Sequence, residues 1–224
     1  MQLCIHEHLR RDRHYRILDL GSRQVVKDHA THRGLLDGYD CDYVGVDVAA
    51  GANVDIVMPK PYRIPLKRST VDVVMTAQAF EHIPFPWASF MEISRVLKPG
   101  GLVFLIAPSR GHRHGTYDCW RYYPDSMRAL AAFARMELLE AYVDMPPRKE
   151  GSKRLDYAAI DSQRSYWGDA VGVFRKPTRP SLQARLMGEL VTHWANRVGE
   201  LPQPSRRPQQ RLRRAAAGRP TESR

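Results

Sequence analysis

Short apolar runs alternate with stretches of helical periodicity along most of the chain. Five runs rich in Val, Ile and Leu are predicted to be buried strands, at 15–20, 43–48, 54–57, 71–75 and 102–107. Strands that alternate with helices are typical of a parallel sheet covered by helices. The pattern therefore predicts an α/β fold with a doubly wound, mostly parallel sheet.

Helices and two further strands are predicted between and after these runs. The clearest helix is 87–97, whose apolar side chains share one face. The segment 98–101, Lys-Pro-Gly-Gly, is a helix stop signal followed by a tight turn. A second helix begins after Asp125, and strands at 137–143 and 170–174 close the sheet.

The chain divides into three segments of different character. Residues 1–176 are predicted to form the α/β domain, in which the polar stretch 144–168 is an inserted lid or surface loop. Residues 177–201 form an amphipathic helical extension that packs on the domain or joins two copies of the chain as a homodimer. Residues 202–224 form a disordered, Arg- and Pro-rich tail. The apolar face of the extension consists of Leu182, Leu186, Leu190, Trp194 and Val198.

The formal charge of +11 is concentrated near the C-terminus. Residues 175–224 hold 12 Lys and Arg against 3 Asp and Glu, so they carry +9 of the total. A basic arm of this kind binds RNA, DNA or an anionic membrane surface by charge alone, or it is a solvated tail without a specific partner. The charge therefore says little about the ligand of the α/β domain.

Composition narrows the class of protein. With 43% hydrophobic and 26% charged residues the chain can bury a core, which excludes full disorder and a short disulfide scaffold. No apolar run approaches the roughly 18 residues of a membrane span, and the first residues lack the pattern of a secretory signal. The three cysteines, Cys4, Cys41 and Cys119, are widely spaced, which fits a reducing compartment. We therefore expect a cytoplasmic protein.

The ends of the first two strands carry candidate ligand-binding groups. Ligands of doubly wound sheets bind beyond the carboxyl ends of the strands, where strand order reverses. The first strand ends in Asp19-Leu20-Gly21-Ser22, and the second ends at Asp47, where an acid accepts hydrogen bonds from both hydroxyls of a ribose. The stretch 21–26 holds a single glycine and would cradle a pyrophosphate poorly. This disfavours NAD and FAD and favours S-adenosylmethionine, which has no phosphate.

Four motifs, in order along the chain, resemble the class I S-adenosylmethionine-dependent methyltransferases, in the group described by the type 11 methyltransferase domain. The most specific part is the Arg-Val-Leu-Lys-Pro-Gly-Gly run at 95–101. The resemblance implies a Rossmann-like domain with S-adenosylmethionine as cofactor. A block at 107–125 also resembles a bacterial subgroup with a His-x-His and an Asp-Cys-Trp-Arg-Tyr-Tyr-Pro-Asp pattern. The four motifs are 17–21, 43–47, 71–82 and 92–101.

The resemblance implies cofactor contacts at the matching positions. Asp19 and Gly21 would line the methionine end of the cofactor, and Asp47 would hold its ribose. The full implied set is Asp19, Gly21 and Ser22 after the first strand, Asp47 and Val48 after the second, near ribose and adenine, and Gln78 and Phe80 after the fourth, near the transferring methyl.

Two departures from the family pattern concern cofactor binding. Ser22-Arg23 stand where the family has a second glycine. Lys60 stands where many members have an acid that accepts from the adenine amino group, so Asp55 or backbone carbonyls would take over that contact. The departures support an alternative, a non-catalytic cofactor-binding or scaffold protein of the same fold.

Histidines near the same sheet edge are candidates for the base that an acceptor hydroxyl needs. We predict His114 or His112 as this base, with Asp118 orienting it or accepting the proton itself. These are zinc-ligand residue types, but their spacing matches no closed zinc site, so no metal is predicted. His82 either contacts the substrate or caps the turn before Pro84. The other substrate-binding candidates are Arg113 and Arg121, for an anionic substrate, and Trp120 and Tyr122, for a ring or sugar or else as core.

The sequence thus predicts an S-adenosylmethionine-dependent methyltransferase that acts on an oxygen of a small molecule or sugar by in-line transfer. One alternative is the non-catalytic protein of the same fold. Another is a nucleic-acid methyltransferase that uses the basic tail. Against the latter, the stretch 76–80, Thr-Ala-Gln-Ala-Phe, lacks the Asn/Asp-Pro-Pro-Tyr signature of base amino methylation.

Overall fold

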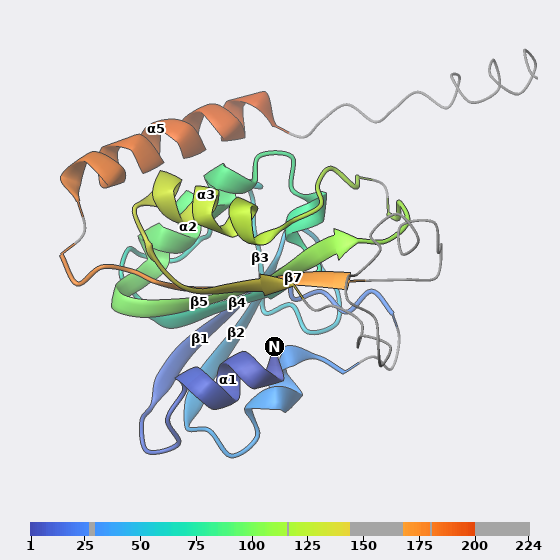
Figure 1. The fold of residues 1–224 in the computed structure, drawn as a ribbon, viewed down its shortest axis with the longest axis vertical. Helices are drawn as coiled ribbons and strands as arrows, with labels where there is room; N and C mark the ends of the chain where they lie inside the picture. Colours follow the sequence, from blue (N-terminus) through green and yellow to red (C-terminus); the bar gives the residue numbers. More distant parts are fainter. Residues whose placement is uncertain (27–29, 116, 144–167, 180, 200–224) are drawn as a thin grey trace, which may run out of the picture.

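A seven-stranded sheet forms the centre of the structure, a computed structural model that describes residues 1–26, 30–115, 117–143, 168–179 and 181–199. The strand order is β3-β2-β1-β4-β5-β7-β6 (Figure 1). All seven predicted strands are present, with ends that differ by a few residues. They are β1 (Tyr15–Leu20), β2 (Cys41–Asp47), β3 (Ile56–Val57), β4 (Val71–Ala77), β5 (Leu97–Arg110), β6 (Glu137–Val143) and β7 (Gly168–Arg175).

The topology creates a switch point between β1 and β4. The first five strands pair in parallel, whereas β7 runs antiparallel to both β5 and β6. The chain runs outward from β1 through β2 and β3, then returns to place β4 on the other side of β1. The carboxyl ends of β1 and β4 therefore meet where strand order reverses, the usual ligand position in such sheets. The predicted doubly wound, mostly parallel α/β fold is confirmed.

Helices cover both faces of this sheet. α2 (Pro86–Val96) and α3 (Pro124–Ala134) lie on one face, and α5 (Leu182–Val198) packs on α2 as an outer layer (Figure 1). α1 (Gln2–His8) and the 3-10 turn η1 (His32–Leu36) lie on the other face. α2 and α3 confirm the two predicted helices, the one at 87–97 and the one that begins after Asp125, with ends that differ by one or two residues.

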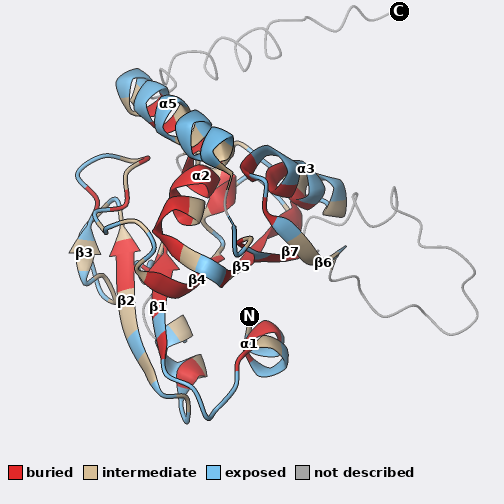
Figure 2. Cartoon of the chain, turned by 90° about the vertical axis from the view of Figure 1, so that its left-hand side faces the viewer, coloured by how far each residue is buried: buried red, intermediate tan, exposed pale blue. Residues whose placement is uncertain are grey.

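Successive side chains of β1 enter two different halves of the core. Leu18 packs with Phe90 of α2, whereas Ile17 packs with Ile5 of α1, and all four are almost fully buried (Figure 2). A parallel strand buried on both faces has a nearly continuous apolar sequence. This double burial explains why the strands are recognisable in the sequence.

The segment 98–101, predicted as a tight turn, belongs to β5 instead. α2 ends just before Leu97, which already pairs with Val71 of β4, and the register shifts before the next pair. The buried amino group of Lys176 donates to the backbone carbonyls of Ser94 and Leu97, each at 2.6 Å. Strand pairing together with this lysine cap ends the helix, which a local turn signal cannot show.

The rotation of α5 differs from the prediction. Its N-cap is the predicted one, because Ser181 Oγ accepts from a backbone N–H of the first turn at 3.4 Å. The predicted apolar face, however, points to solvent: Leu182 and Leu190 are 67% and 65% exposed. Thr192 and Ala195 face the domain and are buried. The expectation that the whole apolar stripe packs on the domain is therefore wrong, although the ring of Trp194 contacts that of Phe85 at 5.2 Å between centroids.

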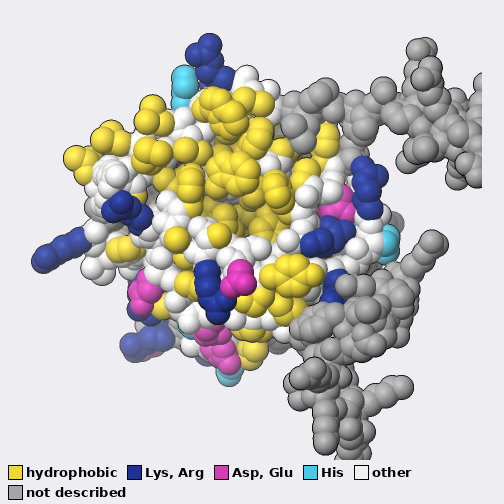
Figure 3. Space-filling model, turned by 45° about the horizontal axis from the view of Figure 1, so that its top comes forward, with side chains coloured by type: hydrophobic (Ala, Val, Ile, Leu, Met, Phe, Trp, Pro, Cys, Tyr) yellow, Lys and Arg dark blue, Asp and Glu magenta, His cyan; other side chains and the backbone are white. Residues whose placement is uncertain are grey.

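Polar contacts fix α5 in this orientation. The side-chain amide of Asn196 makes two hydrogen bonds with the backbone of Tyr62. It accepts from the N–H at 3.0 Å and donates to the carbonyl at 3.1 Å. Glu189 pairs with Arg63 at 3.2 Å and with Arg68 at 2.6 Å. Hydrophobic side chains gather on the outward face that results (Figure 3). A homodimer through this helix stays a prediction.

Two predicted segments lie outside the described residues. These are the insertion 144–168, apart from Gly168 at the start of β7, and the tail 202–224. Within the described part of the chain, no helix combines the length and the apolar character needed to cross a membrane.

Candidate functional site

The loops after β1 and β4 touch at the switch point, and Gly21 makes this contact possible. Gly21 has φ of +80°, and a Cβ at this position would lie 2.5 Å from Cβ of Ala79. The adjacent Gln78 also has a left-handed backbone, with φ of +52°. Its side chain donates to Asp169 at 2.9 Å. Left-handed backbone at a non-glycine residue is costly and is concentrated at functional sites.

We expect Gly21→Ala to destabilise the protein by at least about 1–2 kcal/mol, because a left-handed alanine is strained and its Cβ would collide with Ala79. Gly34→Ala is the matched control, since its φ is not left-handed and a Cβ there would touch nothing within 4 Å. The measurement is urea unfolding followed by circular dichroism. Equal stabilities of the two variants would contradict the tight fit at Gly21.

Asp19 lies beneath this loop rather than at its surface. The carboxylate is 2% exposed, accepts from the hydroxyl of Tyr43 at 2.5 Å, and lies 3.0 Å from Nδ1 of His32. Burial, together with the Asp19 charge, raises the pKa of Tyr43. Asp19 thus holds neighbouring elements in place, and a direct contact with the cofactor stays a prediction.

Asp47 stands at the carboxyl end of β2, as predicted. One carboxylate oxygen accepts from the backbone N–H of Ala49 at 3.0 Å, and the other accepts from that of Arg23 at 3.3 Å. A carboxylate has about four acceptor positions, so these two bonds orient it and leave capacity for two hydroxyls. Val48 beside it is 52% exposed, which suits contact with a flat ring.

Ser22 closes the loop instead of facing outward. Its hydroxyl donates to the carbonyl of Asn53 at 2.9 Å, and the amide of Asn53 donates back to the carbonyl of Ser22 at 2.9 Å. Asp55, one of the two substitutes considered for the adenine contact, accepts from Arg33 at 2.9 Å and from the N–H of Gly45 at 2.7 Å. Both bonds end on the same carboxylate oxygen, so Asp55 keeps capacity to accept, and Asp55 and backbone carbonyls both stay candidates for that contact.

These residues fit a nucleoside without a pyrophosphate. A crossover between parallel strands usually contains an α-helix. Between β1 and β2 the described residues form only the turn η1, so no α-helix N-terminus among them faces the loop at Gly21. An anion site of the dinucleotide type needs that terminus. The close backbone approach at Gly21 and the oriented carboxylate of Asp47 match the donor and acceptor needs of S-adenosylmethionine.

The block after β5 is fastened to the 3-10 turn η2 (Phe80–His82), which follows β4. The N–H of Cys119 donates to the carbonyl of Glu81 at 2.7 Å, and the hydroxyl of Tyr122 donates to that of Phe80 at 3.0 Å. The indole N–H of Trp120 donates to the carbonyl of Ile83 at 3.0 Å. Residues distant in sequence are thus joined beside the switch point.

This docking places two histidines against a buried acid. Nε2 of His82 lies 3.5 Å, and Nε2 of His114 lies 3.7 Å, from Oε1 of Glu81, whose side chain is fully buried. Desolvation by burial raises the pKa of Glu81. The guanidinium of Arg121 binds both oxygens of Asp118, and this pairing lowers the pKa of Asp118 to about 2. The carboxylate of Asp118 also accepts a hydrogen bond from the backbone N–H of His114 at 2.9 Å.

The other candidates are spread over different environments. His112 and Arg113 are exposed, and Arg121 is engaged with Asp118 rather than open to an anion. Phe80 is fully buried, and its ring contacts the rings of Phe90 and Tyr122.

Aromatic residues of the 107–125 block are mainly structural. Tyr122 is 4% exposed and belongs to the core, whereas Trp120 stays partly exposed and contacts Trp87 at 6.0 Å between ring centroids. Sequence analysis missed Glu81. The Phe-Glu-His motif contains it, but the sequence does not show that the motif meets His114.

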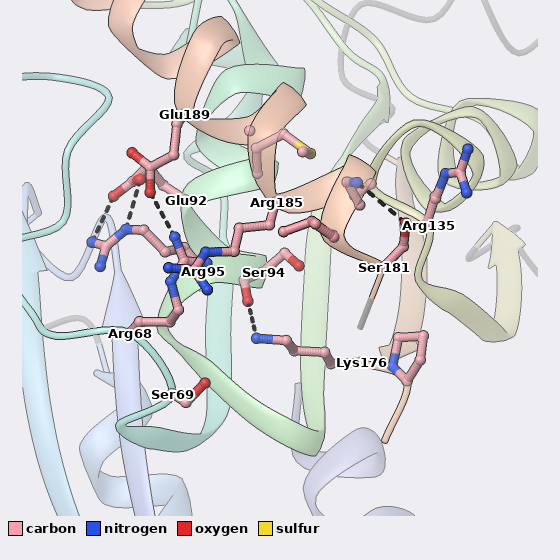
Figure 4. A pocket seen from close by; sticks show the side chains of 16 residues that line it. Arg68, Ser69, Glu92, Ser94, Arg95, Arg135, Lys176, Ser181, Arg185 and Glu189 are labelled. Carbon is pink, nitrogen blue, oxygen red and sulfur yellow. Dashed lines mark hydrogen bonds and ion pairs between the residues drawn. The ribbon is translucent and has the colours of Figure 1, made fainter. Parts of the chain in front are cut away.

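A cavity of about 290 Å³ lies away from the strand ends, between α2, α3 and α5 (Figure 4). It is rich in cations, but the buried ones are already paired. Lys176 caps α2, and Arg95 forms an ion pair with Glu92 at 2.8 Å. Desolvation, aided by nearby arginines, lowers the pKa of Lys176 to about 8. The cavity is therefore a packing gap under α5 rather than an anion site.

Comparison with known proteins agrees with this geometry. A family model described as "Methyltransferase domain" matches residues 18–105. An uncharacterised methyltransferase of Mycobacterium bovis is 36% identical over 77 residues, which cover 32% of this chain and 29% of the relative. One of Mycobacterium ulcerans is 33% identical over 91 residues, covering 38% and 34%. The matched region thus spans about a third of the length of these curated relatives.

Solved structures show the same fold at low identity. A methyltransferase-like protein of Bacillus halodurans has a TM-score of 0.56 at 17% identity, covering 79% of this chain and 99% of that one. The cyclase SpnF reaches 0.60 at 16% identity, covering 80% and 81%. A phosphoethanolamine N-methyltransferase of Haemonchus contortus in complex with S-adenosylhomocysteine reaches 0.53 at 18% identity, covering 79% and 52%.

The sheet, its switch point and the Asp47 edge define a Rossmann-like domain of the kind that binds S-adenosylmethionine. Within that domain, residues 18–105 are similar to the methyltransferase domain family, and the solved structures share its fold.

Proposed function

We propose that the protein transfers a methyl group from S-adenosylmethionine to an oxygen of a small molecule or sugar. The observation that carries the proposal is the shared sheet edge. Asp47 and Gly21, suited to the cofactor, lie at the carboxyl ends of β2 and β1. In the Glu81–His82–His114 cluster, Glu81 and His82 follow β4 and His114 follows β5. The cofactor and acceptor chemistries therefore meet at the switch point.

The protein's main task in this reaction is positioning. The bound cofactor would supply a methyl group on a sulfonium sulfur. The sulfur leaves as a neutral sulfide, so the leaving group needs little assistance. Asp47 would hold the ribose hydroxyls, and the backbone at Gly21 would admit the methionine end. Fixing donor and acceptor in line replaces a bimolecular encounter, which contributes several kcal/mol to catalysis.

An acceptor hydroxyl must also lose its proton, and His114 is the base we propose for this step. Its Nδ1 lies 3.4 Å from Asp118, whose carboxylate stays ionised beside Arg121. A histidine oriented by a carboxylate through one nitrogen presents the other nitrogen as a base. His112, which is exposed, is the alternative base.

Two other functions stay as alternatives. The neighbour SpnF is named a cyclase, so the fold also serves proteins that are not named methyltransferases. The non-catalytic interpretation itself rests on the altered glycine loop, in which Ser22-Arg23 replace the second glycine of the family. The nucleic-acid interpretation rests on the charge of 202–224, outside the described residues.

A label-transfer assay separates these functions. The full chain and a chain ending at Leu201 are incubated with methyl-labelled S-adenosylmethionine and, separately, with free and nucleotide-activated sugars, phenols, bulk RNA and DNA. We expect the label to appear in a sugar or phenol. The transfer rates of the two chains should agree to within about twofold and depend little on salt. Label in nucleic acid that the shortened chain loses would favour the basic tail. Cofactor binding without transfer to any acceptor class would favour the non-catalytic protein.

A further inference from the structure

Glu81 is a buried acid without a hydrogen-bond donor. Its side chain is fully buried, and neither carboxylate oxygen accepts a hydrogen bond from any residue that the structure describes. Leaving a buried polar group unsatisfied costs about 1–3 kcal/mol, and more for a charged one. A buried acid in this state is either neutralised by a proton or compensated by a cation beside it.

The two histidines beside Glu81 cannot both supply that charge by ordinary hydrogen bonds. Nδ1 of His82 lies within hydrogen-bonding distance of the backbone carbonyl of Tyr117. A carbonyl only accepts, so this nitrogen carries the proton and Nε2 of the neutral ring presents a lone pair to Glu81. In His114, Nδ1 lies 3.4 Å from the carboxylate of Asp118, an ion-pair distance rather than a hydrogen bond, and Nε2 lies 3.7 Å from Glu81.

Three electron-pair donors therefore converge on one point. The Nε2 atoms lie 3.5 and 3.7 Å from Oε1 of Glu81, too far for good hydrogen bonds, and the three ligand atoms lie within 4.8 Å of one another. Ligands bound to one tetrahedral zinc ion at about 2.0–2.1 Å stand about 3.3 Å apart. We propose that Glu81, His82 and His114 bind a divalent first-row transition metal ion, for which Zn²⁺ is the best match.

The surroundings have the features of a metal site. Histidine ligands usually donate their second ring nitrogen to a carbonyl or carboxylate, which fixes the ring and its tautomer. The carbonyl of Tyr117 and the carboxylate of Asp118 stand in these places, and Arg121 anchors Asp118. The imidazoles of His82 and His114 are about one-third exposed, so a fourth ligand can enter from solvent.

Two histidines and one carboxylate are the donor set of open, catalytic zinc sites. An ion here would bind an acceptor oxygen and lower its pKa, which would replace His114 as the base, because the same Nε2 cannot do both. Metal binding itself does not depend on the proposed methyl transfer. It can be measured without cofactor or acceptor.

Direct metal titration of the full chain tests the proposal. Protein freed of metal with EDTA is titrated with Zn²⁺ against a chromophoric chelator, and Co²⁺ is added separately to record visible absorption. We expect one tight Zn²⁺ per chain and the intense bands of four- or five-coordinate Co²⁺. Glu81→Gln and His114→Ala should weaken Zn²⁺ binding by at least about 100-fold, and Asp118→Asn by about 10–100-fold.

Matched controls locate the ion. His112→Ala, two positions from His114 and exposed, should bind like the wild type. So should His8→Ala, which removes a second group of metal-ligand types, Glu7, His8 and Glu140. Far-ultraviolet circular dichroism identifies variants that fail to fold. The Co²⁺ spectrum of the wild type tests the site even if the variants do not fold. Folded wild type that binds no Zn²⁺, or loss of the ion in His8→Ala alone, would overturn the proposal.

Discussion

Replacing Arg95 by methionine is expected to lower the free energy of unfolding by about 3–5 kcal/mol. Arg95 and Glu92 lie one helical turn apart on α2 and are 8% and 2% exposed. Nε and Nη2 of Arg95 donate to the carboxylate at 2.8 Å each. Nη2 also donates to the carbonyl of Ile64 at 2.7 Å, and Nη1 donates to that of Leu66 at 2.8 Å. The variant leaves the buried Glu92 with the partly exposed Arg63, at 3.1 Å, as its remaining cationic partner, and it removes the donors to both carbonyls.

Guanidinium-induced unfolding at neutral pH provides the measurement, and α3 provides the control. Arg128 and Asp125 form an ion pair with the same three-residue separation, but their side chains are 64% and 89% exposed. Arg128→Met should change stability by less than about 1 kcal/mol. The double variant Arg95→Met with Glu92→Leu should recover part of the loss, because no charge is then left buried. Similar losses for Arg95→Met and Arg128→Met would refute this account.

Asp47→Ala should weaken binding of S-adenosylhomocysteine by about 100-fold. The carboxylate would accept two hydrogen bonds from ribose hydroxyls, and losing a pair of charge-assisted bonds costs roughly 3 kcal/mol. The backbone N–H groups of Arg23 and Ala49 hold the carboxylate in the required orientation, so wild type is already arranged for the ligand. Isothermal titration calorimetry measures both affinities.

Asp42→Ala is the control for this binding experiment. Asp42 lies at the opposite end of β2, is exposed, and pairs with His14 at 3.4 Å. Its removal should leave the affinity unchanged, and NAD should not bind either protein. If Asp47→Ala bound as tightly as wild type, the cofactor would lie elsewhere than the carboxyl end of β2. If the folded wild type did not bind, the non-catalytic interpretation would gain support.

The strands and the residues at their ends could be predicted because their cause is local. A strand buried on both faces is a run of apolar residues, and the residue after it stands at the sheet edge. Asp47 and Gly21 were located in this way, without knowledge of any contact. The left-handed backbone at Gly21 was also expected of a glycine at a strand end.

Contacts between distant segments could not be predicted from periodicity. The stripe Leu182–Val198 has the spacing of a packed face, yet it faces solvent because Asn196 and Glu189 bind loop residues from the other side of α5. Residues 98–101 carry a turn signal, but pairing of Leu97 with Val71 draws them into β5. In both cases a tertiary interaction outweighs a local preference.

The sequence by itself determined the α/β class, the order of its elements, the resemblance of residues 18–105 to a methyltransferase domain and the sheet edge at which we predict the site. Each of these follows from local patterns, because burial on two faces and chain reversal at strand ends act on neighbouring residues. Only the tertiary structure decided which side chains meet. Glu81 and His114 are 33 positions apart in the chain, and docking of the block after β5 onto η2 brings them within 3.7 Å. Such a distance depends on the packing of two loops, which no single stretch of sequence encodes.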